Sequence, residues 1–271
     1  MKKVVLIIGN RYQPNACGFI REFEKTGKKI EGILCLESKR EFMFYAKIPF
    51  RIIKILTFSN VKYLLKSIVT LIAGKQQLNT LKGSWNNVGE NSWDVLGNEF
   101  DIIKYAREKE ICVRFSPFLS ATVIDFYTKN GPVIFPMYAG GILSKKILTN
   151  PNAEFINAHM GSMPRYRGMN VIEWAILEHE PPKVAVMVMN EVIDGGDVMW
   201  QKDIDVSNEQ TIRELRTTGY MYCYIAMAEG VSEYLDNNNL RKTQENKGKY
   251  YYRMHSKIRE LTEMELLSRS E

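Results

Sequence analysis

The chain has 271 residues, of which 45% are hydrophobic and 25% are charged, and it carries a formal net charge of +6. This composition is ordinary for a soluble globular protein, and the length fits one large domain, or one domain with an appendage, that buries its core without disulfides. A modest positive charge is compatible with anionic partners such as phosphates, and equally with a mildly basic surface that binds none.

The four cysteines are widely scattered and no C-x-x-C pair occurs, which excludes zinc-site spacing and a disulfide framework. We therefore expect no metal and a reducing, cytoplasmic compartment. The apolar run at the N-terminus is too short for a signal peptide, and no uninterrupted apolar stretch reaches the ~18 residues of a membrane-spanning helix.

The first 36 residues predict a β-α-β unit. Residues 3–9 are β-branched and aliphatic, as in a fully buried strand, residues 16–27 have the pattern of an amphipathic helix that ends at a glycine, and residues 29–36 predict a second strand. Such an opening is typical of a parallel sheet covered by helices. The turn after the first strand lacks G-x-G-x-x-G, so the fingerprint of dinucleotide binding is absent.

Residues 40–80 form an apolar segment punctuated by lysines and an arginine, with a helical pattern that breaks near Pro49 or Ser59. Two interpretations stay open: a basic amphipathic segment that lies on a membrane surface, or a pair of helices packed on the domain or on a partner subunit. We favour packing, because every apolar position of the segment can belong to a core.

The remaining elements alternate between helices and strands. We expect a loop over 81–95, helices over 96–110, 119–129, 169–179 and 209–234, a helix that begins at Ile142, and strands over 111–115, 132–139, 154–159, 184–189 and 197–201. A polar tail begins at Asp236 and ends in a helix.

These elements predict an α/β fold with a Rossmann-like, mostly parallel sheet and helices on both faces, plus a helical insertion and a short C-terminal tail. The expected boundaries are 1–235 for the main domain, with the insertion at about 40–80, and 236–271 for the tail.

The densest cluster of informative residues begins at Asn157 and ends at Gly168. Asn157 and His159 are two residues apart on a predicted strand, so their side chains face the same way. Open α/β sheets bind ligands beyond the carboxyl ends of their strands, so an amide and an imidazole are presented together where a ligand would lie. Taken alone, a core histidine with satisfied hydrogen bonds explains this pair more simply.

A carboxylate follows on a glycine-rich turn between two apolar strands, where Asp194 precedes Gly195 and Gly196. The glycines let the backbone approach a ligand closely or adopt positive φ. Considered by itself, Asp194 would be a turn-capping residue.

Together these features resemble the folate-dependent formyltransferase family, whose signature runs Asn-x-His, a proline-containing loop, Tyr-Arg-Gly and, further on, Asp-x-Gly. The matching residues are Asn157, His159, Pro164, Tyr166, Arg167, Gly168, Asp194 and Gly196. The resemblance runs from the first strand to about Gly230, apart from 40–80, and within the family it is strongest to the nucleotide-sugar N-formyltransferases.

The resemblance implies that Asn157, His159 and Asp194 form a catalytic trio and that 10-formyltetrahydrofolate is the formyl donor. The Asn157 amide can donate to the formyl oxygen as negative charge develops there, and one such donor is worth about 3 kcal/mol. His159 can donate as well, or can accept the proton that the amine loses, and both roles stay open. Asp194 would hold the imidazole in its working tautomer or position a water molecule.

The folate is expected against the end of the strand over 132–139 and near the Asp-x-Gly turn. The implied folate contacts are Met137, Tyr138, Ala139, Gly140, Gly141, Ile142, Ile193 and Gly195. Gly140 and Gly141 would let the backbone approach the pterin, although a strand-to-helix turn without a ligand explains this segment equally well.

The implied contacts to the amine substrate are Asn10, Arg11, Met163, Tyr166, Arg167 and Gly168. The chain departs from the family pattern after His159, where Met160 and Gly161 replace the usual Pro-Ser, and in the strand over 182–187, which lacks the usual histidine. These departures concern contacts around the trio and leave the trio itself intact.

Three branches of the family fit less well. The Gly-Ser-Asn phosphate loop of glycinamide ribonucleotide formyltransferases is replaced by Gly9 followed by Asn10 and Arg11. The tail leaves no room for the barrel domain of methionyl-tRNA formyltransferases, and the chain begins at the first strand, without the regulatory domain of formyltetrahydrofolate hydrolases.

The stretch 248–253 resembles the Gly-x-Tyr-Tyr-x-Arg segment of enzymes that N-formylate nucleotide-linked amino sugars. Its tyrosines could stack on a base while Arg253 meets a phosphate, or the stretch could be an aromatic strand packed on the core.

We therefore expect formyl transfer to a primary amine on a nucleotide-linked amino-deoxysugar for surface polysaccharide synthesis. The expected partners are the folate and the nucleotide sugar, with no nucleic acid and no transmembrane segment, and a homodimer is one assembly that fits. The alternatives are formylation of another small amine or of methionyl-tRNA, a folate-binding regulator without catalysis, and membrane-surface assembly through 40–80.

Overall fold

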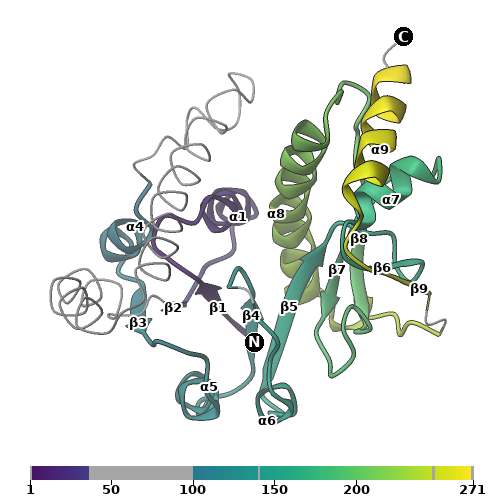
Figure 1. Ribbon diagram of the computed structural model, residues 1–271. Coiled ribbons are helices and arrows are strands. Elements are labelled where there is room, and N and C mark those ends of the chain that lie inside the picture. The colour runs from purple at the N-terminus through teal and green to yellow at the C-terminus, as the bar shows by residue number, and fades with distance from the viewer. Residues whose placement is uncertain (1, 37–99, 140, 246–247, 270–271) are drawn as a thin grey trace, which may run out of the picture. The chain divides into compact units, whose positions relative to one another are not determined.

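The computed structural model describes residues 2–36, 100–139, 141–245 and 248–269. A seven-stranded sheet runs through the described chain, with the strand order β3-β2-β1-β4-β5-β7-β8 (Figure 1). Its strands are β1 (Lys3–Ile8), β2 (Gly32–Cys35), β3 (Cys112–Phe115), β4 (Val133–Pro136), β5 (Ala153–His159), β7 (Lys183–Val188) and β8 (Val198–Asp203).

The first five of these strands are parallel, and β7 and β8 are antiparallel to their neighbours. The expectation of a mostly parallel α/β sheet is confirmed. After β3 the chain returns to place β4 beside β1, so the strand order reverses between these two strands. Ligands of open α/β sheets bind beyond the carboxyl ends of strands near such a reversal, which in this sheet are the ends of β1, β4 and β5.

Helices cover both faces of the sheet (Figure 1). They are α1 (Pro14–Lys25), α4 (Ile102–Glu108), α5 (Ala121–Thr128), α6 (Lys145–Leu148), α7 (Val171–Leu177), α8 (Ile212–Asp236) and α9 (Ser256–Ser268), with a 3-10 turn at Asn238–Leu240. Helices α1 and α8 pack against each other on one face, and α5 and α6 lie on the other. Among the described residues, no helix combines the length and the apolar character that crossing a membrane requires.

Apolar side chains on one face of the central strands form the core under α5 and α6. Val5 and Ile7 of β1 pack with Phe135 of β4 and Phe155 of β5, and the rings of these two phenylalanines stack 5.1 Å apart. Because side chains alternate between the two faces of a strand, Asn157 and His159 lie on the same face as Phe155, further along β5. The apolar pattern that buries β5 therefore also sets the direction of its two polar side chains.

Several element boundaries differ from the sequence-based expectation. Helix α1 begins at Pro14 rather than at residue 16, because proline is well suited to the first turn, where its missing N–H is not needed. Helix α6 begins at Lys145 rather than at Ile142, after the extended Ser144. The insertion at about 40–80 and the loop over 81–95 lie outside the described residues.

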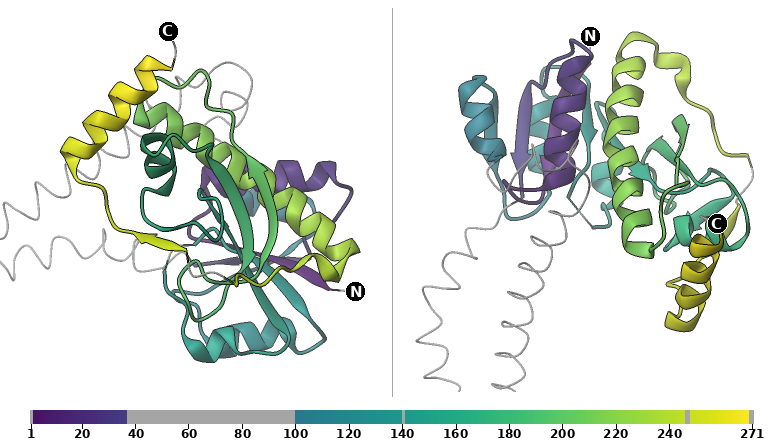
Figure 2. Two further views of the ribbon diagram at one scale, coloured as in Figure 1. Left: turned by 90° about the vertical axis from the view of Figure 1, so that its right-hand side faces the viewer. Right: turned by 90° about the horizontal axis from the view of Figure 1, so that it is seen from above.

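A second, two-stranded sheet was not expected from the sequence. Strand β6 (Tyr166–Gly168) pairs in parallel with β9 (Lys249–Tyr251), so the Tyr-Arg-Gly segment joins the C-terminal tail. Helix α9 then packs on α7, and Figure 2 shows β9 and α9 beside the elements that they contact. The tail from residue 236 thus makes extensive contacts with the main sheet's domain, and the boundary predicted at 235 stays a prediction.

Candidate active site

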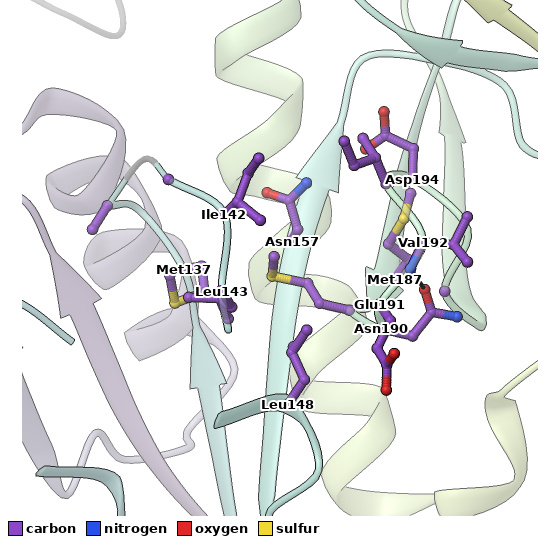
Figure 3. A pocket seen from close by; sticks show the side chains of 15 residues that line it. Met137, Ile142, Leu143, Leu148, Asn157, Met187, Asn190, Glu191, Val192 and Asp194 are labelled. Atoms are coloured by element: carbon purple, nitrogen blue, oxygen red, sulfur yellow. Dashed lines mark hydrogen bonds between the residues drawn. The ribbon is translucent and has the colours of Figure 1, made fainter. Parts of the chain in front are cut away.

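Asn157 and His159 lie within the last three positions of β5, where the strand leaves its partner β4. Figure 3 shows the Asn157 side chain projecting from β5 into a pocket, with Ile142 on one side and the segment of Asp194 on the other. The amide is therefore placed to meet a ligand rather than to fill the core.

Asp194 lies in the loop between β7 and β8 and has a φ of 51°, in the left-handed region that aspartate tolerates better than most residues. Its Oδ1 lies 3.6 Å from His159 Nδ1, and its Oδ2 accepts a hydrogen bond of 2.8 Å from the Gly168 N–H. The side chains of His159 and Asp194 are only 11% and 13% exposed. The predicted trio thus comes together, with an imidazole–carboxylate separation slightly beyond hydrogen-bond length.

A glycine is required two residues after Asp194. A Cβ on Gly196 would overlap the carbonyl oxygen of Val188, so any side chain here would push the loop away from the sheet. The Asp-x-Gly spacing therefore has a steric cause in this chain, and it keeps Asp194 close to His159.

His159 is enclosed by acceptors on both ring nitrogens. Its Nε2 lies 3.1 Å from the Tyr166 carbonyl oxygen, and its Nδ1 faces Asp194. Burial lowers the pKa of His159 from its ordinary value, against the Asp194 carboxylate and the Tyr166 carbonyl, which raise it. A neutral imidazole has one N–H and can donate a hydrogen bond to only one of these two acceptors. A protonated imidazole has two N–H groups and can donate to both, so the two acceptors stabilise the ring once it has accepted a proton.

The departure at Met160 and Gly161 has a structural reason. A Cβ on Gly161 would lie 2.6 Å from the Tyr166 carbonyl oxygen and 2.8 Å from His159 Nε2. The missing side chain allows these two atoms to approach, and Met160 turns away to pack against Gly219 of α8.

A first pocket of about 260 Å³ opens beside Asn157 (Figure 3). Its lining consists of Met137, Ala139, Gly141, Ile142, Leu143, Leu148, Asn157, Met187, Met189, Asn190, Glu191, Val192, Ile193, Asp194 and Gly196. Five of the residues expected to contact folate lie here: Met137, Ala139, Gly141, Ile142 and Ile193.

The other three expected folate contacts are placed differently. The Tyr138 ring packs on Phe19 of α1, with the centroids 5.6 Å apart, and burial raises the pKa of its hydroxyl, reinforced by Cys223 and Tyr224. Gly195 is not among the residues that line the first pocket, and Gly140 lies outside the described residues.

A second pocket of about 360 Å³ opens at His159. Its lining consists of His159, Met160, Gly168, Met169, Asn170, Val171, Ile172, Glu173, Arg216, Tyr220, Arg253, Met254 and Arg259. Asn157 and Asp194 therefore line the first pocket and His159 lines the second, so the trio stands between two cavities.

The residues expected to contact the amine substrate have mixed positions. Gly168 lines the second pocket, whereas the Tyr166 ring is 1% exposed, stacks on Tyr251 at 5.2 Å and donates to Glu178. Met163 packs in a small buried cluster with Met187 and two other residues.

The two expected contacts in the first turn, Asn10 and Arg11, line neither pocket. The Asn10 Oδ1 accepts from the Tyr12 N–H at 3.0 Å, and an Arg11 Nη1 lies 3.8 Å from Asp101. These residues order the turn before α1, and their contact with substrate stays a prediction.

The sequence pattern did not reveal Gln244, although it joins the tail to the candidate site. Its amide donates to the carbonyl oxygens of Gly196, at 2.6 Å, and Asp194, at 3.3 Å. Its oxygen accepts from the buried Arg167 guanidinium at 2.8 Å. Arg167 therefore supports the Asp194 loop through Gln244. This contact joins segments that are distant in the chain, so no local sequence pattern predicts it.

Within the described ranges, no group of three His, Cys, Asp or Glu side chains is arranged to hold a metal ion.

Comparison with known proteins connects this site to a family. The family model described as "Formyl transferase" matches residues 121–221, which include β5, β6 and the loop of Asp194. Over residues 121–221 the chain is therefore similar to the formyl transferase family. The resemblance deduced from the trio is confirmed for this part of the chain.

A curated protein to which the chain is similar is a methionyl-tRNA formyltransferase from Prochlorococcus marinus, 42% identical over 77 residues. The match covers 28% of this chain and 24% of that protein. The chain thus spans about a quarter of that relative's length, which leaves the activity of the whole protein to be proposed.

Solved structures show the same fold over nearly the entire chain. A 4-N formyltransferase from Francisella tularensis is 15% identical, with a TM-score of 0.51 over 99% of this chain and 87% of its own. An N-formyltransferase from Helicobacter canadensis, in complex with folinic acid and dTDP-3-aminofucose, is 14% identical, with a TM-score of 0.53 over 98% of this chain and 81% of its own. At these identities the likeness shows a shared fold.

Proposed function

We propose that this protein is a folate-dependent N-formyltransferase in which the first pocket holds 10-formyltetrahydrofolate and the second holds the amine. The observation that carries the proposal is the position of the trio between the two pockets. A group-transfer enzyme needs its donor and its acceptor on opposite sides of the reacting atoms.

The first pocket has the character that a folate ring requires. Ile142 is 87% exposed and Ile193 is 52% exposed, and such bare apolar side chains on a pocket rim suit a flat aromatic ligand. Met137, Leu143 and Met187 extend this apolar surface inward, as Figure 3 shows. The 10-formyltetrahydrofolate supplies the formyl carbon that the amine attacks.

The three side chains then have separate tasks. The Asn157 amide donates to the formyl oxygen, where negative charge develops as the amine bonds to the carbon. His159 accepts the proton that the amine nitrogen gives up, because the amine enters from the second pocket. The bond between the formyl carbon and folate N10 then breaks, and N10 takes up a proton as tetrahydrofolate leaves. The Asp194 carboxylate then lies beside the positive ring and stabilises it, while the Gly168 N–H holds that carboxylate in place.

For the acceptor, we propose an amino-deoxysugar linked to a nucleotide, formylated in the cytoplasm for surface polysaccharide synthesis. The support is the fold shared with N-formyltransferases such as the Helicobacter canadensis protein, whose complex holds an aminofucose nucleotide. Methionyl-tRNA is the second candidate, because the curated relative with the matching segment has that activity.

The test is a transfer assay with 10-formyltetrahydrofolate, a panel of UDP-, dTDP-, GDP- and CMP-linked amino sugars, and methionyl-tRNA. We expect transfer to one amino-sugar nucleotide, and His159→Asn should lower its kcat by about 10²- to 10⁴-fold, the usual contribution of a general base. The matched control is His179→Asn, because His179 is exposed and pairs with Glu265 far along the chain.

Two results would contradict the proposal. Transfer to methionyl-tRNA alone would leave the formyl chemistry intact and replace the sugar substrate. No folate turnover with any amine, combined with folate binding by the wild type, would leave a folate-binding protein without transferase activity.

A further inference from the structure

The second pocket has an arginine-rich wall that the proposed chemistry does not use. Arg216 comes from α8, Arg259 from α9, and Arg253 from the segment between β9 and α9. The acidic side chain in the lining is Glu173, so the wall carries a net positive charge.

Glu173 and Arg216 neutralise each other. The Glu173 side chain is 1% exposed, and its Oε1 lies 2.5 Å from both the Nε and an Nη of Arg216. It also accepts from the Asn170 amide at 2.9 Å. Two nitrogens of the Arg216 guanidinium thus meet one Glu173 oxygen, which holds the guanidinium in one orientation on the pocket wall, because a buried carboxylate requires a charged partner.

Arg253 and Arg259 have no such partner. Both are exposed, and among the described residues neither guanidinium makes a hydrogen bond or an ion pair. A guanidinium stays charged at any physiological pH and presents a planar fork of donors that matches two phosphate oxygens. Two unneutralised arginines in the lining of one cavity therefore make an anion-binding wall.

We propose that Arg253 and Arg259 bind the diphosphate of a nucleoside diphosphate in the second pocket, whose wall Arg216 also lines. The inference rests on the proposed function, since it places the acceptor's amine at His159 and its charged group at the arginines. The ring of Tyr220, which is 39% exposed, lines the same pocket and offers a surface for the base or the sugar.

The dimensions of the site favour a small anion over RNA. The cavity of about 360 Å³ lies within the range of small-molecule pockets. A surface that binds the backbone of a nucleic acid is instead an extended basic stripe with many phosphate contacts. A single concave wall with two available guanidinium groups matches one diphosphate.

The test measures binding directly, without requiring turnover. UDP, dTDP, GDP and inorganic pyrophosphate are titrated calorimetrically into the full-length chain and into the double variant Arg253→Gln/Arg259→Gln. Both arginines are exposed and unpartnered among the described residues, so the fold should be retained. The matched control is Arg213→Gln, an exposed arginine one turn before Arg216 on α8 that does not line the pocket.

We expect at least one nucleoside diphosphate to bind the wild type and Arg213→Gln equally, and to lose about 10- to 100-fold in affinity in the double variant. Added salt should weaken binding to the wild type more than to the double variant. Binding of folinic acid, which belongs to the first pocket, should be the same in all three proteins.

Equal affinity of every diphosphate for the wild type and the double variant would overturn the inference, as would the absence of diphosphate binding. Arginine-dependent binding of transfer RNA without diphosphate binding would overturn it in favour of an RNA acceptor. Arginine-dependent diphosphate binding without formyl transfer to any amine would uphold the anion site and count against the proposed function alone.

Discussion

At the scale of single residues, the protonation of His159 has consequences for stability and activity. Burial lowers the pKa of His159 below its ordinary value of 6.5, so the unfolded chain binds a proton more readily than the folded chain as the pH falls. Stability from this residue is therefore fully present above the ordinary pKa and is lost on acidification below it. We expect the free energy of unfolding, measured with urea, to fall between pH 7 and pH 5, and to fall less in His159→Gln.

The lowered pKa of His159 also determines how activity depends on pH. A proton acceptor must be neutral, so kcat/KM should decrease on the acidic side with an inflection below the ordinary histidine pKa. An inflection above that value would mean that the Asp194 carboxylate outweighs burial, and it would contradict a lowered pKa for His159.

Asp194 combines an unusual backbone conformation with a charge, and two variants separate these properties. Asp194→Asn keeps a side-chain oxygen for the Gly168 N–H and tolerates the φ of 51°, so it should fold normally. We expect its kcat to fall by about 10²-fold, because the protonated ring loses its counter-charge. Asp194→Ala should in addition lose about 1–2 kcal/mol of stability, since alanine pays a steric penalty in the left-handed region. Thermal unfolding and single-turnover kinetics of both variants distinguish the two effects.

At the scale of elements, the candidate site depends on hydrogen bonds that join β6, the β7–β8 loop and the tail. Strand β6 supplies the Gly168 N–H to Asp194, while its Arg167 meets Gln244 of the tail. The pairing of β6 with β9 fixes this segment, and a Cβ on Gly168 would overlap the Tyr251 carbonyl oxygen. The tail is thus part of what holds the carboxylate beside His159.

Gln244 is accordingly expected to be a positioning residue. Gln244→Ala removes the donor to the Gly196 and Asp194 carbonyl oxygens and should cost about 1–3 kcal/mol of stability, the penalty for unpaired buried polar groups. We expect kcat to fall while KM for the amine changes little, because the amine lies in the other pocket. Gln210→Ala, at an exposed glutamine, is the control, and equal kcat values in the two variants would refute the assignment.

At the scale of the whole molecule, the two pockets share no lining residue and should bind their ligands separately. Folinic acid at a hundredfold excess over its Kd should stabilise the folded chain by about 2.7 kcal/mol and raise the melting temperature. His159→Asn should keep this rise, because His159 lines the second pocket. Ile142→Asp should reduce it, because Ile142 lines the first pocket and is exposed enough to be replaced without unfolding.

The control for this prediction is Leu261→Asp on α9, a position that is 54% exposed and lines neither pocket. Melting curves with and without folinic acid supply the measurement. A folate-induced rise that disappears in His159→Asn but persists in Ile142→Asp would show that the ligands occupy the pockets in the opposite order.

The sequence by itself determined the parallel α/β sheet and the helices on its faces, because the periods of apolar residues report directly which side of each element is buried. It also determined that Asn157 and His159 share one face of a strand, since that relation is local and follows from the period of two. Family resemblance added Asp194, which no periodicity connects to the pair.

Only the tertiary structure decided what depends on contacts between distant segments. The pairing of β6 with β9, the part played by Gln244 and the arginine wall of the second pocket all bring together residues far apart in the chain. Local sequence patterns do not predict such contacts, because strand pairing and cavity formation depend on how whole elements pack together. Tyr166 and Arg167, which the resemblance implies as substrate contacts, are buried in the folded chain, and their contact with substrate stays a prediction.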